Sequence, residues 1–184
     1  MRRLLLVRHG STDAVRAAAF GNDEPLDDHG RDGAARLRAR LPRGEILVSP
    51  MRRAVQTAAD LGPCRVVKEL AECDFGTWAG LTLRDVDPED LGAWMTDPGA
   101  TPHGGESLTT LLHRVATWLD EQAALDGTAV AVTHGGVVKA AVVHALDAPP
   151  SAFWRIDVSP LSITELHAHD GRWTVTRVNQ QEPK

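Results

Sequence analysis

Short apolar runs recur along the chain without the polar alternation of a half-exposed strand. Such runs are typical of strands buried on both faces, in a sheet that helices cover. They predict strands at 4–7, 45–48, 65–67 and 128–133. The last part of the chain alternates apolar and polar residues instead, and this alternation predicts antiparallel edge strands at 162–166 and 173–178.

Between the apolar runs, apolar residues recur at helical spacing. The spacing predicts helices at 30–41, 106–125 and 135–146, of which the second is the longest. Ser49 followed by Pro50 predicts the N-cap and first residue of another helix, which should end near residue 61. Buried strands that alternate with helices indicate an α/β protein.

Composition limits the domain count and the class of partner. A chain of 184 residues suits one domain, so we expect a single domain over 1–184 with a frayed tail at 179–184. The net charge of -5 disfavours nucleic acid or an anionic membrane surface as the main partner. A small positive pocket for an anionic substrate remains compatible with this charge.

The sequence favours a cytoplasmic protein. The apolar stretch at the amino terminus is too short for a signal peptide. The most apolar later stretch, 129–146, is broken by His134 and Lys139, so we expect no membrane span. Cys64 and Cys73 do not make a disulfide framework, which favours a reducing compartment.

Polar residues suited to binding an anion follow the first apolar run at once. Arg8 and His9 end the strand, Gly10 lets the backbone turn, and Ser11 and Thr12 are suited to capping a helix. Open α/β sheets bind ligands at the carboxyl ends of their strands, and arginine beside a helix amino terminus favours negative charge. A histidine that faces an anion suggests catalysis, although a structural strand that ends in two polar residues would read the same.

The run at 128–133 ends in the same way, with His134 followed by glycine. Phosphoryl transfer needs a nucleophile, positive groups for the phosphoryl oxygens and a proton for the leaving oxygen. The two histidines could supply imidazoles, Arg8 and Arg53 guanidiniums, and Glu72 the proton. A serine nucleophile lacks the Gly-X-Ser-X-Gly elbow, and neither HEXXH nor a Cys/His cluster points to a metal.

Five segments, in order along most of the chain, together resemble the histidine phosphatase superfamily in its phosphoglycerate-mutase-like branch. The first is Leu-Val-Arg-His-Gly, which ends at Gly10, and the others follow it in the family's order. The matching segments are 5–10, 49–58, 70–80, 102–107 and 132–136. The resemblance implies a three-layer α/β/α sandwich with a mostly parallel central sheet, of phosphoglycerate-mutase-like fold.

The resemblance also implies a role for each matching polar residue. His9 would attack phosphorus and form a phosphohistidine intermediate. Arg8, Arg53 and a protonated His134 would hold the phosphoryl oxygens, and Glu72 would protonate the leaving oxygen and then activate water. No metal ion or organic cofactor is required. The expected enzyme is a phosphoric monoester hydrolase of the histidine acid phosphatase type.

Two positions depart from the family pattern. The family often has glutamate directly after Arg-His-Gly and asparagine a few residues later, where this chain has Ser11 and Val15. The second change removes one possible phosphate contact, so the arginines or the backbone must suffice, or Thr12 or Arg16 must help.

The spacing of the motifs favours hydrolysis over phosphoryl transfer to a second substrate. Mutases of the family carry a longer insertion between the acid loop and the second histidine, whereas 72–134 is short here, which leaves the site open to water. The expected substrate is a small phosphorylated metabolite. The segments 94–98 and 102–107 look most like small phosphatases of the α-ribazole-phosphatase type.

Two other functions remain as alternatives. One is phosphoglycerate-mutase-type transfer, and the other is a non-catalytic module that binds a phosphorylated ligand. A binding module should have lost one of the five catalytic positions, and all five are intact.

The leaving-group pocket should come from the loop-rich stretch at 75–106. Trp78 and Trp94 are candidates for contacting the organic part of the substrate, although anchoring the core or a loop is the more common role for such a tryptophan. The other candidate pocket residues are Ser11, Thr12, Glu106 and Gly135. Glu106 could instead be a charge in the first turn of the long helix.

Overall fold

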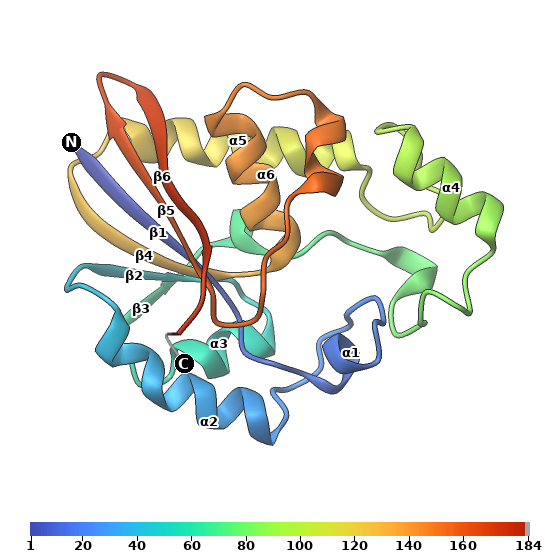
Figure 1. Ribbon diagram of the computed structural model, residues 1–184, viewed down its shortest axis with the longest axis horizontal. Coiled ribbons are helices and arrows are strands. Elements are labelled where there is room, and N and C mark those ends of the chain that lie inside the picture. Colours follow the sequence, from blue (N-terminus) through green and yellow to red (C-terminus); the bar gives the residue numbers. More distant parts are fainter. Residues whose placement is uncertain (183–184) are drawn as a thin grey trace.

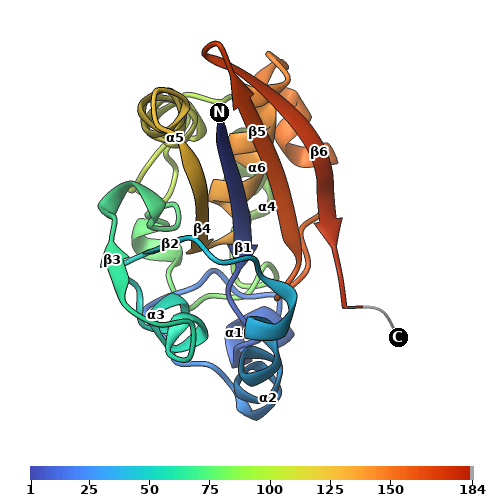
Figure 2. The same ribbon diagram turned by 90° about the vertical axis from the view of Figure 1, so that its left-hand side faces the viewer.

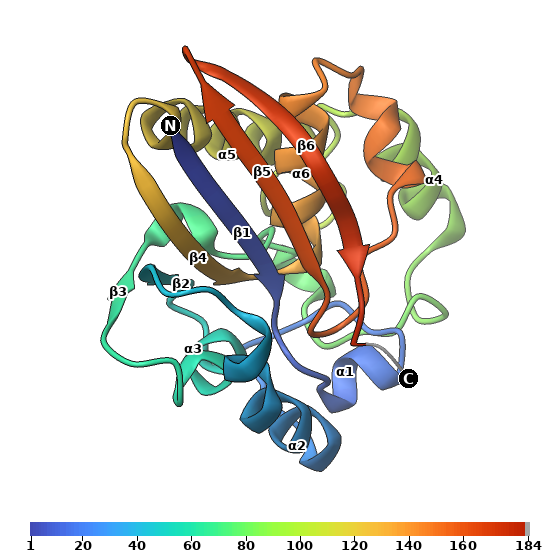
Figure 3. The ribbon, with the colours of Figure 1, turned by 60° about the vertical axis from the view of Figure 1, so that its left-hand side comes forward.

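Six strands form one sheet in the computed structural model, which describes residues 1–182. The strands are β1 (Arg2–Arg8), β2 (Glu45–Val48), β3 (Cys64–Val66), β4 (Gly127–Thr133), β5 (Ile163–His169) and β6 (Arg172–Gln180). Their order is β3-β2-β4-β1-β5-β6. The first four strands are parallel, whereas β5 pairs antiparallel with β1 and β6 pairs antiparallel with β5 (Figure 3). The predicted mostly parallel sheet is confirmed.

Helices cover both faces of this sheet. The helices are α1 (Asp13–Arg16), α2 (Asp28–Leu37), α3 (Arg52–Ala58), α4 (Pro88–Thr96), α5 (Leu108–Ala123) and α6 (Gly135–Ala145), with 3-10 turns η1 (Arg38–Arg40), η2 (Lys68–Leu70), η3 (Gly76–Trp78) and η4 (Pro150–Arg155). α5 and α6 lie on one face, and α2 and α3 on the other (Figure 1 and Figure 2). The predicted three-layer α/β/α sandwich is therefore confirmed.

Strand β1 shows why its apolar run is unbroken. Successive side chains of a strand point to opposite faces. Leu4 and Leu6 pack in the core beneath α5 and α6, whereas Leu5 and Val7 pack in the core beneath α2 and α3. All four side chains are buried. A layer of helices on each face thus requires apolar residues at every position.

The loops beyond the sheet carry a separate aromatic cluster. Phe20, Trp78, Val86 and Trp94 are its buried members. The backbone amide of Phe20 donates to the carbonyl of Leu81, at 2.9 Å, which ties the loop after α1 to the loop after η3. Because these loops bury their own apolar side chains, they are ordered without strands.

Three predicted boundaries differ from the structure. The helix expected from Ser49 begins at Arg52, because residue 51 is still extended; the Ser49 hydroxyl contacts His134 and accepts from the Met51 amide. The helix expected at 30–41 is α-helical from Asp28 to Leu37 and ends in the 3-10 turn η1. The tail expected to fray from residue 179 begins later, since 179–180 belong to β6; residues 183–184 lie outside the described part.

No helix within residues 1–182 is both long enough and apolar enough to cross a membrane.

Candidate active site

The two predicted catalytic histidines lie side by side. β1 and β4 are neighbouring parallel strands, and their register pairs Arg8 with Thr133, so the next residue of each strand is a histidine. The backbone amide of His9 donates to the carbonyl of Thr133 at 2.8 Å. The ring centroids of His9 and His134 are 5.1 Å apart. Strand register alone therefore brings together two residues that are far apart in the sequence.

His9 is held as a neutral imidazole with a free electron pair. Its Nδ1 lies 2.7 Å from the carbonyl oxygen of Gly10, and since a carbonyl only accepts, Nδ1 carries the proton. The other ring nitrogen, Nε2, accepts a hydrogen bond from Nε of Arg53 at 3.1 Å. Burial, and then the charge of Arg53, lower the pKa of His9 to about 3. Nε2 is therefore a nucleophile at neutral pH.

Arg53 is buried although it carries a full charge. Its side chain is 2% exposed, and its guanidinium donates to the backbone carbonyl of Asn22 at 2.5 Å. The Glu24 carboxylate, 3.5 Å away, balances part of the charge. The hydroxyl of Thr57, one helical turn later, accepts from the Gly10 amide at 3.0 Å, so α3 positions both the arginine and the turn after His9.

Arg8 is the second guanidinium at the site. It donates to the backbone carbonyl of Val158, and its Nε is buried with no hydrogen-bond partner within residues 1–182. A β-carbon on Gly135, at the start of α6, would lie 3.5 Å from that Nε, in ordinary van der Waals contact. A buried donor without a partner suits an anionic ligand.

His134 is fully buried at the end of β4. Its Nε2 lies 2.7 Å from the hydroxyl of Ser49, and its Nδ1 has no hydrogen-bond partner within residues 1–182. Burial, followed by the charges of its neighbours, lowers the pKa of His134 well below its ordinary value. Without a bound anion these effects favour the neutral imidazole, whereas a dianion bound beside His134 would favour the protonated form expected during phosphoryl transfer.

Glu72 lies at the amino terminus of α6. One carboxylate oxygen accepts from the backbone amide of Gly136 at 3.2 Å, and the other accepts from the amide of Cys73 at 3.0 Å. This carboxylate lines the same cavity as His9 and Arg53. Glu72 is thus placed to act as an acid on a ligand bound in that cavity.

The cavity that His9 lines has a volume of about 140 Å³. Its walls include Arg8, His9, Val15, Glu24, Arg53 and Glu72. Val15 occupies part of the wall where the family often has asparagine, and it offers no polar contact. Within residues 1–182 no three or more His, Cys, Asp or Glu side chains are grouped to hold a metal ion.

The remaining predicted pocket residues divide into two groups. Trp94 and Gly135 line a second cavity beside the first. Trp78 is buried against Phe20 in the aromatic cluster. Ser11 donates to Asp27, Thr12 caps α1, and Glu106 pairs with Arg114. In this structure the side chains of Trp78, Ser11, Thr12 and Glu106 therefore have structural partners.

Two residues at the site were missed in the sequence. Ser49 contacts His134, but its position before proline indicated an N-cap, a signal that outweighed its place directly after a buried strand. Glu24 faces Arg53 from a turn-rich loop that has no periodic pattern, so nothing in the sequence could have predicted that contact.

Comparison with known proteins places the chain in a family. Residues 4–181 match the histidine phosphatase superfamily (branch 1). A bifunctional protein of Mycobacterium tuberculosis is 35% identical over 97% of this chain and 54% of its own length. This chain thus spans about half the length of that curated relative. An adenosylcobalamin/alpha-ribazole phosphatase of Salmonella typhimurium is 31% identical, over 97% of this chain and 96% of that protein.

Solved structures agree with this placement. The mycobacterial glucosyl-3-phosphoglycerate phosphatase superimposes with a TM-score of 0.86 at 30% identity, over 98% of this chain and 100% of that one. The fold is thus shared over nearly all of this chain. The family match covers nearly all of the sequence, including the strand ends that carry both histidines. The chain therefore belongs to the histidine phosphatase superfamily.

Proposed function

We propose that the protein is a metal-independent phosphomonoester hydrolase that acts on a small phosphorylated metabolite through a phosphohistidine on His9. The observation that carries the proposal is the state of His9. A neutral imidazole presents Nε2 to a cavity that two guanidiniums line. A nucleophile in this setting attacks an anionic phosphate without first losing a proton.

The reaction takes place in two displacements. His9 Nε2 bonds to phosphorus as the bond from phosphorus to the alcohol oxygen breaks, and Glu72, protonated beforehand, gives its proton to that oxygen. Water then attacks the phosphohistidine while the Glu72 carboxylate takes up a proton. The bond from phosphorus to Nε2 breaks, phosphate leaves, and His9 is regenerated. The Gly10 carbonyl holds the proton on Nδ1 throughout.

Arg8, Arg53 and His134 would stabilise the phosphoryl oxygens in both displacements. All three are fixed by protein contacts before substrate binds. Donors that are already oriented need not reorganise as charge develops, and each contributes on the order of 100-fold or more in rate.

Hydrolysis is favoured over mutase-type transfer by two observations. The segment between Glu72 and His134 is too short to contain a long insertion. Relatives that align with this chain over nearly their whole length, at about 30% identity, are named phosphatases. A cytoplasmic location fits the free cysteines, Cys64 and Cys73.

The test is hydrolysis of p-nitrophenyl phosphate with a chelator present. We expect activity in the wild type, loss of turnover in His9→Ala, and no change in His113→Ala, which removes an exposed histidine of α5. A denaturing quench should trap a phosphoryl group on the peptide that contains His9. Equal activity in His9→Ala and the wild type would contradict the proposal.

Assays on the same protein distinguish the hydrolase from a mutase and from a binding module. Transfer to 3-phosphoglycerate from a bisphosphoglycerate primer, faster than release of phosphate, would indicate a mutase. Tight phosphate-ester binding with neither turnover nor a trapped intermediate would indicate a binding module.

A further inference from the structure

A second cavity adjoins the cavity that His9 lines. Its volume is about 220 Å³, and it shares Arg8, Glu72 and Phe75 with the first. Its remaining walls are mainly apolar and come from Trp94, Leu108, Leu111, Phe153 and Trp154. Glu72 faces both cavities, so an alcohol that it protonates could extend from the first cavity into the second.

Lys139 gives this apolar cavity a positive charge. It lies on α6 one turn after Gly135, and its Nζ is 5.3 Å from the centre of the Phe153 ring. The side chain forms no ion pair within residues 1–182, and burial lowers its pKa. Asp157, the other charged group of the cavity wall beyond Glu72 and Arg8, accepts a hydrogen bond from the Val158 amide. A half-buried ammonium without a bound counter-ion is suited to an anionic ligand.

We propose that this cavity is the subsite for the alcohol part of the substrate, and that it selects phosphomonoesters with an apolar body and a carboxylate that pairs with Lys139. The inference rests on the proposed function, since it assigns the substrate class of the same site. Lys139 is here a specificity-determining residue, while the phosphate chemistry stays with His9, Glu72 and the arginines.

The test compares three aryl phosphates: 4-carboxyphenyl, its neutral 4-carbamoyl analogue and the cationic 4-aminomethyl analogue. We expect the wild type to prefer the carboxylate by about tenfold in kcat/KM, the usual effect of one charge-assisted hydrogen bond. Lys139→Met should lose this preference and keep its rate on the neutral ester. Lys68→Met, which changes an exposed lysine, should keep both the preference for the carboxylate and the rate on the neutral ester.

The outcomes distinguish a failure of the subsite from a failure of the proposed function. Turnover of the neutral ester without preference for the carboxylate, or with preference for the cation, would overturn the subsite and leave the proposed function intact. Failure to hydrolyse any of the three esters, with no trapped phosphohistidine, would overturn the proposed function itself.

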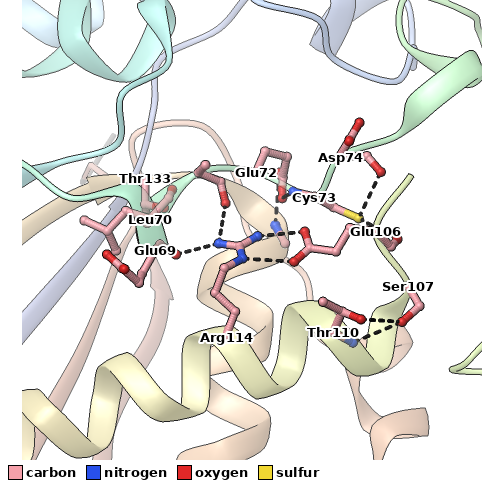
Figure 4. Close-up of polar contacts among 12 residues, drawn as sticks. Glu69, Leu70, Glu72, Cys73, Asp74, Glu106, Ser107, Thr110, Arg114 and Thr133 are labelled. Atoms are coloured by element: carbon pink, nitrogen blue, oxygen red, sulfur yellow. Dashed lines mark hydrogen bonds and ion pairs between the residues drawn. The ribbon is translucent and has the colours of Figure 1, made fainter. Parts of the chain in front are cut away.

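A different observation concerns the loop that carries Glu72. Arg114 of α5 donates to the backbone carbonyls of Glu69 and Ala71, at 2.6 and 3.0 Å, and pairs with both oxygens of Glu106, at 2.9 and 2.8 Å (Figure 4). The carbonyl between them, of Leu70, accepts from the hydroxyl of Thr133 at 2.7 Å. Three successive carbonyls before Glu72 therefore have side-chain donors.

Glu106 contacts the same loop on the other side of Glu72, through its backbone. Its backbone amide donates to the carbonyl of Asp74 at 2.8 Å, and its backbone carbonyl lies 3.4 Å from Sγ of Cys73. The Arg114 and Glu106 side chains are 22% and 12% exposed, so the pair is shielded from water. The loop is thus held before Glu72 by the Arg114 side chain and after Glu72 by the Glu106 backbone, and an ion pair joins Arg114 to Glu106.

We infer that Arg114 is a positioning residue for Glu72, acting through the loop and with Glu106 as its partner. A guanidinium suits this task because its fork of donors can reach two carbonyls and a carboxylate at once. Its loss would let the Glu72 carboxyl drift from the leaving oxygen, and a displacement of about 1 Å can cost roughly 100-fold in rate.

The dependence on the leaving group distinguishes this role from a general effect on folding. p-Nitrophenolate leaves readily without a proton, whereas an alkoxide needs one. In Arg114→Gln and in Glu106→Gln we expect kcat for an alkyl phosphate to fall at least about tenfold, with a much smaller change for p-nitrophenyl phosphate. Glu72→Gln should show the same pattern, and Arg36→Gln, on the exposed face of α2, should show neither loss.

Equal losses on the two substrates, or no loss on either, would overturn the role of Arg114. If Arg114→Gln does not fold, Arg114→Lys provides the same comparison, because lysine keeps the charge but cannot make the forked contacts. A wild type that hydrolyses neither ester would instead count against the proposed function.

Discussion

Arg52 and Arg53 are neighbours in α3 with opposite surroundings. Arg52 is exposed, whereas Arg53 is buried against His9. The helix turns by about 100° per residue, so only one of two adjacent side chains can face the site. The motif predicts the arginine directly before alanine, which is the one that the structure places there.

This contrast provides a matched pair of variants. We expect Arg53→Ala to lower kcat/KM for p-nitrophenyl phosphate by about 100-fold or more, since a preoriented donor is lost from the phosphoryl oxygens. Arg52→Ala should stay close to the wild type. Steady-state kinetics of the two proteins checks this, and similar losses in both would show that Arg53 has no special role.

At the scale of elements, the carboxyl ends of β1 and β4 and the amino terminus of α6 position the histidines and Glu72. The parallel register of β1 and β4 brings the histidines together, and α6 begins directly after His134. The backbone of that first turn also receives Glu72, through the amide of Gly136. A glycine is needed there, because a β-carbon on Gly136 would come within 2.2 Å of the Glu72 carboxylate.

Gly136→Ala should therefore separate stability from catalysis. Alanine favours a helix interior over glycine by about 1 kcal/mol, so the fold should remain intact, while the flexible Glu72 side chain is pushed aside. We expect a loss of activity on alkyl phosphates that is larger than on p-nitrophenyl phosphate. Gly92→Ala, in α4, where nothing within residues 1–182 lies within 4 Å of an added β-carbon, is the control. Unchanged alkyl phosphate activity in Gly136→Ala would contradict the contact.

For the whole molecule, the buried histidines link folding to pH. The pKa of His9 is about 3 in the folded protein, against an ordinary value of 6.5. Between these values the unfolded chain binds the extra proton, so the free energy of unfolding falls as the pH falls below about 6.5. His134 acts in the same direction, because its pKa is lowered too.

Urea unfolding in phosphate-free buffer measures this effect. Between pH 7.5 and 5 we expect His9 to account for at most about 2 kcal/mol of lost stability. The loss should be smaller in His9→Asn, and carboxylates contribute little in this window. Wild-type and variant curves that stay parallel over the range would mean that His9 is protonated in the folded protein.

Local pattern and motif order were sufficient to predict the α/β/α layers and the strand ends that carry the histidines. Apolar periodicity reports which faces of an element are buried, and residues that follow a strand must lie at its end. Boundaries were predicted less accurately: α3 begins three residues after Ser49, because residue 51 is still extended and the Ser49 hydroxyl also contacts His134.

Other properties depend on packing between distant segments. Glu24 beside Arg53, the neutral state of both histidines, and the Arg114 contacts to the Glu72 loop join residues with no common spacing. The protonation state of a side chain depends on its burial and on neighbouring charges, and both are determined only when the chain is folded. The sequence therefore predicts that the catalytic groups at the strand ends meet. The tertiary structure decides their charge, the residues that hold them in place and the space left for substrate.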